Sequence, residues 1–230
     1  MLFSTERLIQ IALTVLLVMV SAVLHELAHG WVALRCGDAT AKEAGRLTLN
    51  PKAHLDPFGS VLLPLLMGLM GGPVFAFAKP VSYNPRRLKN PRRDELLVAL
   101  AGPACNVLQA LVGTALLWVL FNAGGATPLV SALPLTVAYW ASSVLTSYVW
   151  VNLILCFFNL VPFPPLDGSK VVLYFLTGRA RQKFYELSQY SMFLLLLLLY
   201  VLPSFLHIDP LGAYFDLTAA PLYNWLLGMV

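Results

Sequence analysis

The sequence is short of charge: only 11% of its 230 residues are Asp, Glu, Lys or Arg, whereas 59% are hydrophobic. A soluble domain is about 25% charged, so this composition argues against a soluble protein and indicates an integral membrane protein. Cysteine is also scarce, because the chain has only three, without a CxxC pair, and a disulfide framework is not expected. The net charge of +4 lies mostly in loops beside apolar segments, so it predicts no nucleic-acid partner.

Long hydrophobic runs are the main feature of the chain. They occupy residues of about 8–34, 57–78, 96–121, 137–162 and 187–206. Because helices satisfy their own backbone groups in lipid, we predict an all-α, polytopic transmembrane helical bundle with about five apolar segments. From Phe58 to Ala78 the second segment contains two Pro and four Gly, and irregular backbone at membrane depth must be packed in protein or line a wet cavity. We therefore predict that this segment re-enters instead of crossing, although a full crossing stays open.

The chain is predicted to form one membrane domain over residues 1–230. Its catalytic core would extend over about 8–178, and C-terminal helices would follow over about 187–229. Within these helices, the stretch 211–229 is interrupted by polar residues and predicts an interfacial helix. The loops 79–95 and 163–186 are rich in Lys and Arg, whereas 122–136 has no charge, so the first two are expected in the cytoplasm.

One charged motif interrupts the first apolar segment: residues 25–29 read HELAH. Ionisable residues inside a membrane segment are costly and mark functional sites. On a helix, His25 and His29 share one face, about 6 Å apart along the axis, so both imidazoles can reach one Zn²⁺. Glu26 would stand beside the metal as a general base. The alternative, a polar contact between helices, is disfavoured by the i, i+4 spacing with Glu26 between the histidines.

A catalytic zinc usually has three protein ligands, and Asp167 is the best candidate for the third. It ends the segment NLVPFPPLDG, residues 159–168, in which three prolines break the helix and Gly168 allows a close approach of backbones. The alternative is that Asp167 caps the N-terminus of a following helix at about 169–177. Because Asp167 and HELAH are both expected near the cytoplasmic face, we favour the metal site.

These motifs give the chain a specific resemblance. It resembles the site-2 protease family of intramembrane zinc metalloproteases, whose two signatures match HELAH and NLVPFPPLDG. The segments GRLTLNPKAHLDPFG, FAKPVSYNP and AGPACN match further parts of short bacterial and archaeal members, in the same order. The sequence shows no PDZ-like or CBS-type insertion, so a minimal prokaryotic member is expected.

The resemblance implies a role for each matching residue. One Zn²⁺ per chain would be held by His25, His29 and Asp167, with Glu26 activating water. Asn159 matches a family residue that holds substrate or the oxyanion, and Asn106 in AGPACN matches a second family Asn of less clear role. The segment around FAFAKPV would form a small re-entrant β-loop able to pair with an unwound substrate strand.

The resulting hypothesis is a zinc-dependent intramembrane endopeptidase that cleaves transmembrane segments of membrane proteins within the lipid bilayer. Its expected location is a prokaryotic inner membrane, with the active site toward the cytoplasm. His54 would have a substrate-binding or supporting role, or would simply bond backbone in its loop. A metal transporter or a non-catalytic zinc-binding membrane protein is the alternative, but the apolar segments offer few polar ligands along their depth.

Overall fold

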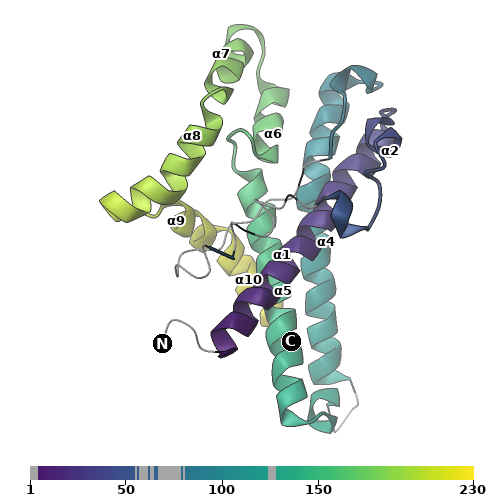
Figure 1. The fold of residues 1–230 in the computed structure, drawn as a ribbon, viewed down its shortest axis with the longest axis vertical. Coiled ribbons are helices and arrows are strands. Elements are labelled where there is room, and N and C mark those ends of the chain that lie inside the picture. The colour runs from purple at the N-terminus through teal and green to yellow at the C-terminus, as the bar shows by residue number, and fades with distance from the viewer. Residues whose placement is uncertain are drawn as a thin grey trace.

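The computed structural model describes residues 5–54, 56, 62, 65, 66, 79, 81–123 and 128–230, which form a helical bundle (Figure 1). In chain order its elements are α1 (Thr5–Arg35), α2 (Thr40–Glu43), η1 (Pro51–Ala53), η3 (Pro85–Arg87), α4 (Pro91–Asn122), η4 (Leu129–Ala132), α5 (Leu135–Leu160), α6 (Asp167–Phe175), α7 (Gly178–Ser188), α8 (Ser191–Leu196), η5 (Leu197–Leu206), α9 (Pro210–Leu217) and α10 (Ala219–Leu227). No β-strand occurs among the described residues. Most of the predicted re-entrant segment 57–78, including the FAFA part of the predicted β-loop, lies outside them.

Three helices of the described chain are long and apolar enough to cross a membrane: Leu8–Arg35, Pro91–Asn122 and Leu135–Leu160. They correspond to the first, third and fourth predicted apolar segments, and they confirm an all-helical membrane protein. The predicted count of about five spans is not confirmed. Residues 187–206 are divided between the end of α7, the short α8 and the π-helical η5, which contains Pro203. A proline inside a helix removes a backbone hydrogen bond, which accounts for irregular winding there.

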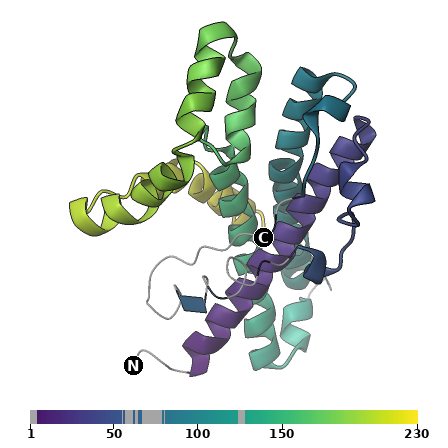
Figure 2. The same cartoon turned by 45° about the horizontal axis from the view of Figure 1, so that its top comes forward.

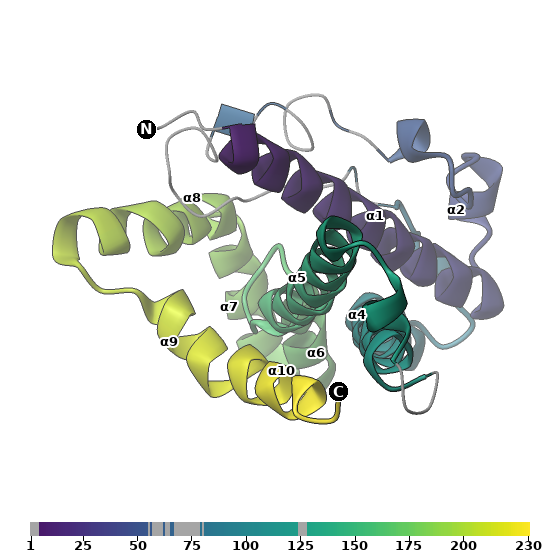
Figure 3. The same cartoon turned by 90° about the horizontal axis from the view of Figure 1, so that it is seen from below.

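The three long helices pack against one another. Helices α4 and α5 are antiparallel neighbours, and α1 crosses both of them (Figures 1 and 3). On the side of α5 away from α1, α10 completes the packing. The buried apolar core of this part is formed by Ala110, Leu117, Val149, Leu153, Ala219 and Leu226. The C-terminal segment is thus two short helices, α9 and α10, of which α10 contributes to the core.

The chain turns sharply after α5 and returns as α6. Helix α6 then forms an antiparallel pair with α7, which leads to α8 (Figure 2). The guanidinium of Arg92 on α4 donates two hydrogen bonds, of 2.9 and 2.6 Å, to the carbonyl oxygen of Tyr174 near the end of α6. Unpaired carbonyls at a helix C-terminus favour such a cation, so this contact helps to hold α6 against α4.

Candidate metal centre

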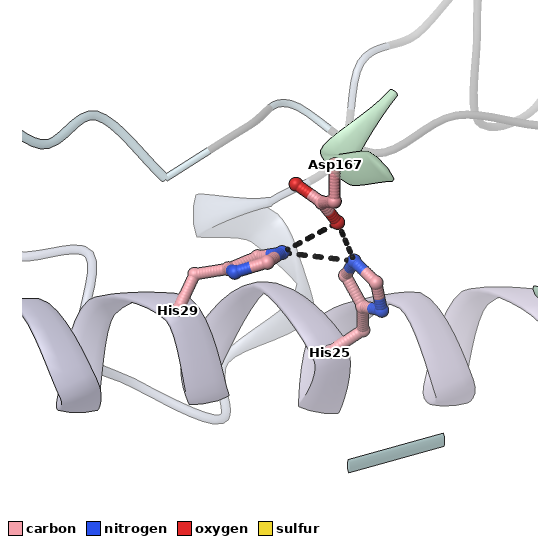
Figure 4. A group of neighbouring side chains, drawn as sticks. All are labelled: His25, His29 and Asp167. Atoms are coloured by element: carbon pink, nitrogen blue, oxygen red, sulfur yellow. Dashed lines mark hydrogen bonds and ion pairs between the residues drawn. The ribbon is translucent and has the colours of Figure 1, made fainter. Parts of the chain in front are cut away.

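The first two predicted ligands lie on one face of α1, as the i, i+4 spacing requires. His25 and His29 are 5% and 7% exposed, and their ring centroids are 4.6 Å apart. Their Nε2 atoms are 2.9 Å apart and point toward the same place (Figure 4). The helix therefore presents two nitrogen donors to a common site in the interior of the bundle.

Asp167 reaches the same place from the first turn of α6. Its Oδ2 lies 3.2 Å from His25 Nε2 and 3.1 Å from His29 Nε2 (Figure 4). The N-cap position of α6 is occupied by Leu166, and no side chain caps the helix, so the alternative that Asp167 is the N-cap is wrong. Within the described residues, these three side chains form the group of His, Cys, Asp or Glu residues arranged to hold a metal ion.

The outer nitrogens of the two rings determine which atoms face the centre. His25 Nδ1 contacts the side-chain oxygen of Asn106, and His29 Nδ1 lies 2.6 Å from the carbonyl oxygen of Val98. Because both partners are acceptors, each Nδ1 carries the ring proton, and each neutral ring presents the lone pair of its Nε2. Two lone pairs and a carboxylate oxygen then face one another, which is favourable only with a positive charge between them.

A zinc ion fits this donor set. Zinc bonds of about 2.0–2.1 Å in tetrahedral geometry place neighbouring donor atoms about 3.3 Å apart. The three observed separations, 2.9, 3.1 and 3.2 Å, are close to this value. Two imidazoles and one carboxylate are also a ligand set that catalytic zinc sites use, with the fourth position left for water or substrate.

Electrostatics also favour an ionised carboxylate at Asp167. Lys170, one turn further along α6, adds a positive charge 3.7 Å from Asp167 Oδ1. The carboxylate is therefore available as an anionic ligand at neutral pH.

Two glycines allow the close packing around the cluster. A Cβ on Gly102 of α4 would overlap the ring atoms of both His25 and His29. A Cβ on Gly168 would overlap the backbone of Leu160 and Val161, which confirms the predicted close approach of backbones at this turn. Both AGPACN and PLDG thus supply a residue without a side chain where the site leaves no room for one.

We expect Gly102→Ala to displace the two imidazoles and to lower zinc content far below one ion per chain. Gly113→Ala, on the same helix, is the matched control, because its Cβ would meet mainly side-chain atoms of Val149 and Tyr148. This control is expected to cost some stability but to keep zinc. Elemental analysis of the two purified variants measures the difference, and equal zinc contents would contradict the packing argument.

Glu26 lies on α1 next to His25, and its carboxylate contacts a different part of the chain. Oε2 accepts a hydrogen bond of 2.7 Å from the backbone N–H of Val81. The segment that contains Val81 is also held at Asn84, whose N–H donates to the buried carboxylate of Asp38 at 2.6 Å. Glu26 is thus oriented by Val81, the last residue of the FAFAKPV segment for which the β-loop was predicted.

Of the remaining predicted residues, one contacts a histidine of the cluster and the other two bond to backbone carbonyls. Asn106 is fully buried against His25, whereas Asn159 donates its side-chain N–H to the carbonyl of Leu155 in its own helix, at 2.9 Å. His54 is fully buried, and its Nε2 lies 2.8 Å from the carbonyl oxygen of Thr48. That contact matches the backbone-bonding alternative for His54.

Behind His25 and Asn106 lie four polar residues that were not predicted as part of the site: Ser21, Gln109, Tyr148 and Asn152. Asn152 accepts a hydrogen bond from Asn106 and donates one to Ser21, each at 3.0 Å. Tyr148 donates to Gln109 at 2.8 Å. These residues are scattered over three helices, and the available signal was only that polar side chains are rare in apolar segments.

The fold and the cluster together define a class: an integral membrane protein with a buried His–His–Asp cluster that could hold a metal ion. Comparison with known proteins then identifies the family. The sequence model of "Peptidase family M50" matches residues 13–199, and the chain belongs to this family, the site-2 proteases. Membership makes the chain a metalloendopeptidase.

Curated relatives agree with this assignment. "Putative zinc metalloprotease YwhC" from Bacillus subtilis is 39% identical over 200 residues, which cover 87% of this chain and 82% of the relative. Two proteins named "Putative zinc metalloprotease Rip2", from Mycolicibacterium smegmatis and Mycobacterium tuberculosis, are 27% and 28% identical over 81% and 78% of this chain. The matches span 65% and 63% of those two relatives. No solved structure matches the chain.

Proposed function

We propose that His25, His29 and Asp167 hold the catalytic Zn²⁺ of an intramembrane endopeptidase that cleaves transmembrane segments of membrane proteins. The observation that carries this assignment is the convergence of three metal-binding atoms, all within 3.2 Å of one another, from segments 138 or more residues apart. Membership of peptidase family M50 supplies the reaction class. A metal transporter is not favoured.

Glu26 would act as the general base. A zinc ion held by His25, His29 and Asp167 would supply the Lewis acidity that lowers the pKa of water to about 7 and polarises a scissile carbonyl. The Glu26 carboxylate takes the proton from the attacking water and passes it to the leaving amine, as its place one residue after His25 allows. The hydrogen bond from Val81 holds one carboxylate oxygen in place while the proton moves.

Asn159 would assist from the end of α5, eight residues before Asp167. A side-chain amide that donates to a developing oxyanion is worth roughly 10²–10³ in rate. Its N–H bonds the carbonyl of Leu155 in the present structure, so a change of side-chain rotamer would precede this role. We propose that bound substrate induces this change.

The location of the site suggests how substrate and water arrive. His25 and His29 are near the C-terminal end of α1, and Asp167 directly follows the end of α5, so the cluster lies toward one end of the bundle. The segments 79–95 and 163–186, which are rich in Lys and Arg, lead into α4 and follow α5, so they are at this same end of the bundle. Basic loops face the cytoplasm, which supports a cytoplasmic orientation of the cluster. A prokaryotic inner membrane is the proposed location, with the predicted β-loop holding the unwound substrate extended.

The first test is metal removal. We expect the detergent-purified protein to contain about one zinc per chain and to cleave a single-span membrane protein after reconstitution in liposomes. A zinc chelator should abolish cleavage, and added Zn²⁺ should restore it, because the water-activating charge is lost and regained. Cleavage that persists without metal would overturn the proposal, as would metal flux across the liposome without proteolysis.

A further inference from the structure

A continuous chain of hydrogen bonds extends from His25 away from the metal site into the bundle. Asn106 on α4 accepts from His25 Nδ1, and its Nδ2 donates to Asn152 Oδ1 on α5 at 3.0 Å. Asn152 Nδ2 then donates to Ser21 Oγ on α1 at 3.0 Å and to the carbonyl oxygen of Tyr148 at 2.9 Å. We propose that Asn152 is a positioning residue that acts through Asn106 to fix the proton and orientation of His25.

The direction of each hydrogen bond in this chain follows from the end that lies farthest from His25, at the carbonyl of Tyr148. The carbonyl of Tyr148 can only accept, so the amide nitrogen of Asn152 must face it, and the amide oxygen faces Asn106. Asn106 must therefore turn its nitrogen toward Asn152 and its oxygen toward His25. The proton of the His25 ring is then required on Nδ1, which leaves the lone pair of Nε2 for the metal.

Burial makes this orientation hard to reverse. Asn106, Asn152 and Ser21 are each 0% exposed, so no side chain in the chain of bonds turns toward solvent. If either amide turned over, two acceptors or two donors would face each other in the interior, and buried polar groups without partners are costly. A backbone carbonyl on α5 thus sets the proton position of a metal ligand on α1.

The arrangement also explains why polar residues are present in these apolar helices. Ser21 lies one helical turn before His25 on α1, so the chain of bonds returns to the helix from which it started. It joins α1, α4 and α5 at the level of the metal site. The inference rests on the zinc site proposed above, and assigns Asn152 a function that the family signatures HELAH and NLVPFPPLDG do not contain.

The test is a double-mutant cycle on zinc affinity, measured by competition with a chelator. We expect Asn152→Leu to raise the Kd for zinc about 10–100-fold, the range typical for partners of metal ligands, and Asn106→Leu to raise it at least as much. If the two residues act in series, Asn106→Leu/Asn152→Leu has the same Kd as Asn106→Leu alone, because Asn152 then has no path to His25. Additive effects, or a Kd for Asn152→Leu within twofold of wild type, would overturn the proposal.

Two further measurements separate positioning from general damage. The visible absorption of Co²⁺ in place of zinc should change in Asn152→Leu, because the geometry of His25 at the metal changes. Thr114→Val, which also removes a buried polar group from the bundle, is the control and should keep the wild-type spectrum and Kd. An unchanged Co²⁺ spectrum in Asn152→Leu would contradict the proposal.

Folding does not decide the outcome. The double variant replaces both amides with apolar side chains and leaves neither of them unpaired, so it is expected to fold even if Asn152→Leu alone does not. If Asn152→Leu alone does not fold, the double variant carries the test. A Kd for zinc in the double variant that equals the Kd of the wild-type protein would overturn the proposal. Absence of zinc from the wild-type protein would instead refute the zinc site itself, so the two failures are distinguishable.

Discussion

Glu26→Gln is expected to abolish peptide cleavage and to leave one zinc ion per chain in place. Glutamine has almost the same shape as glutamate, and its carbonyl oxygen can accept the 2.7 Å hydrogen bond from Val81. It cannot accept the proton of the attacking water. General acid–base catalysis is worth typically 10²–10⁴ in rate, so cleavage should fall by at least about two orders of magnitude.

The measurement pairs elemental analysis with cleavage of a reconstituted single-span substrate. Glu95→Gln is the matched control, because Glu95 is a carboxylate on α4 that accepts from Tyr83 at 3.2 Å and does not belong to the metal cluster. It should keep both zinc and activity. Activity retained in Glu26→Gln would refute the role of general base, and zinc lost in this variant would assign Glu26 a role in building the site.

The central part of the site was predictable because it depends on local rules. Helical periodicity fixes the relation of His25 to His29 whatever the rest of the fold does. Asp167 was predictable from its surroundings, since prolines end α5 and Gly168 permits the tight return that brings the carboxylate back to α1. The three long helices were predictable for a similar reason, because length and hydropathy suffice to identify them.

The supporting parts depend on contacts between distant helices, and no local pattern contains them. Asn106 meets His25 across 81 residues, and Asn152 meets Ser21 across 131. Which of the few polar side chains face one another is decided by the rotation of each helix about its axis, and the packing of the bundle sets that rotation. The same applies to Gly102, whose importance is visible only with the two histidine rings beside it.

The irregular segments were the least predictable. Residues 187–206 contain an uninterrupted run of leucines, which favours one long helix, yet the structure divides them among the end of α7, α8 and η5. Asn159 shows a finer limit. The sequence gives its position near the end of α5, but the hydrogen bond to Leu155 depends on a choice of rotamer that sequence does not encode.

Asp167→Asn is expected to remove zinc and with it all activity. The substitution keeps the size of the side chain and replaces an anionic ligand by a neutral amide. Asp94→Asn is the matched control, because Asp94 is equally buried (5% exposed, against 7% for Asp167) and its oxygen accepts from the N–H of Asn90 at 2.8 Å, which an amide oxygen can also do. Elemental analysis should find zinc far below one per chain in Asp167→Asn and about one per chain in Asp94→Asn.

The physical reason is the charge of the buried site. With Asp167 ionised, two neutral imidazoles and one carboxylate reduce the net charge of a bound Zn²⁺ to about +1, and without it the full +2 would be buried at the depth of the membrane helices. The negative charge left around such an ion is too small to keep it bound. The nearby Lys170 adds a further positive charge, which the Asp167 carboxylate offsets at 3.7 Å in the native protein. If Asp167→Asn retained one zinc per chain and cleaved substrate, the third ligand would have to be another side chain, and the charge argument would fail with the assignment.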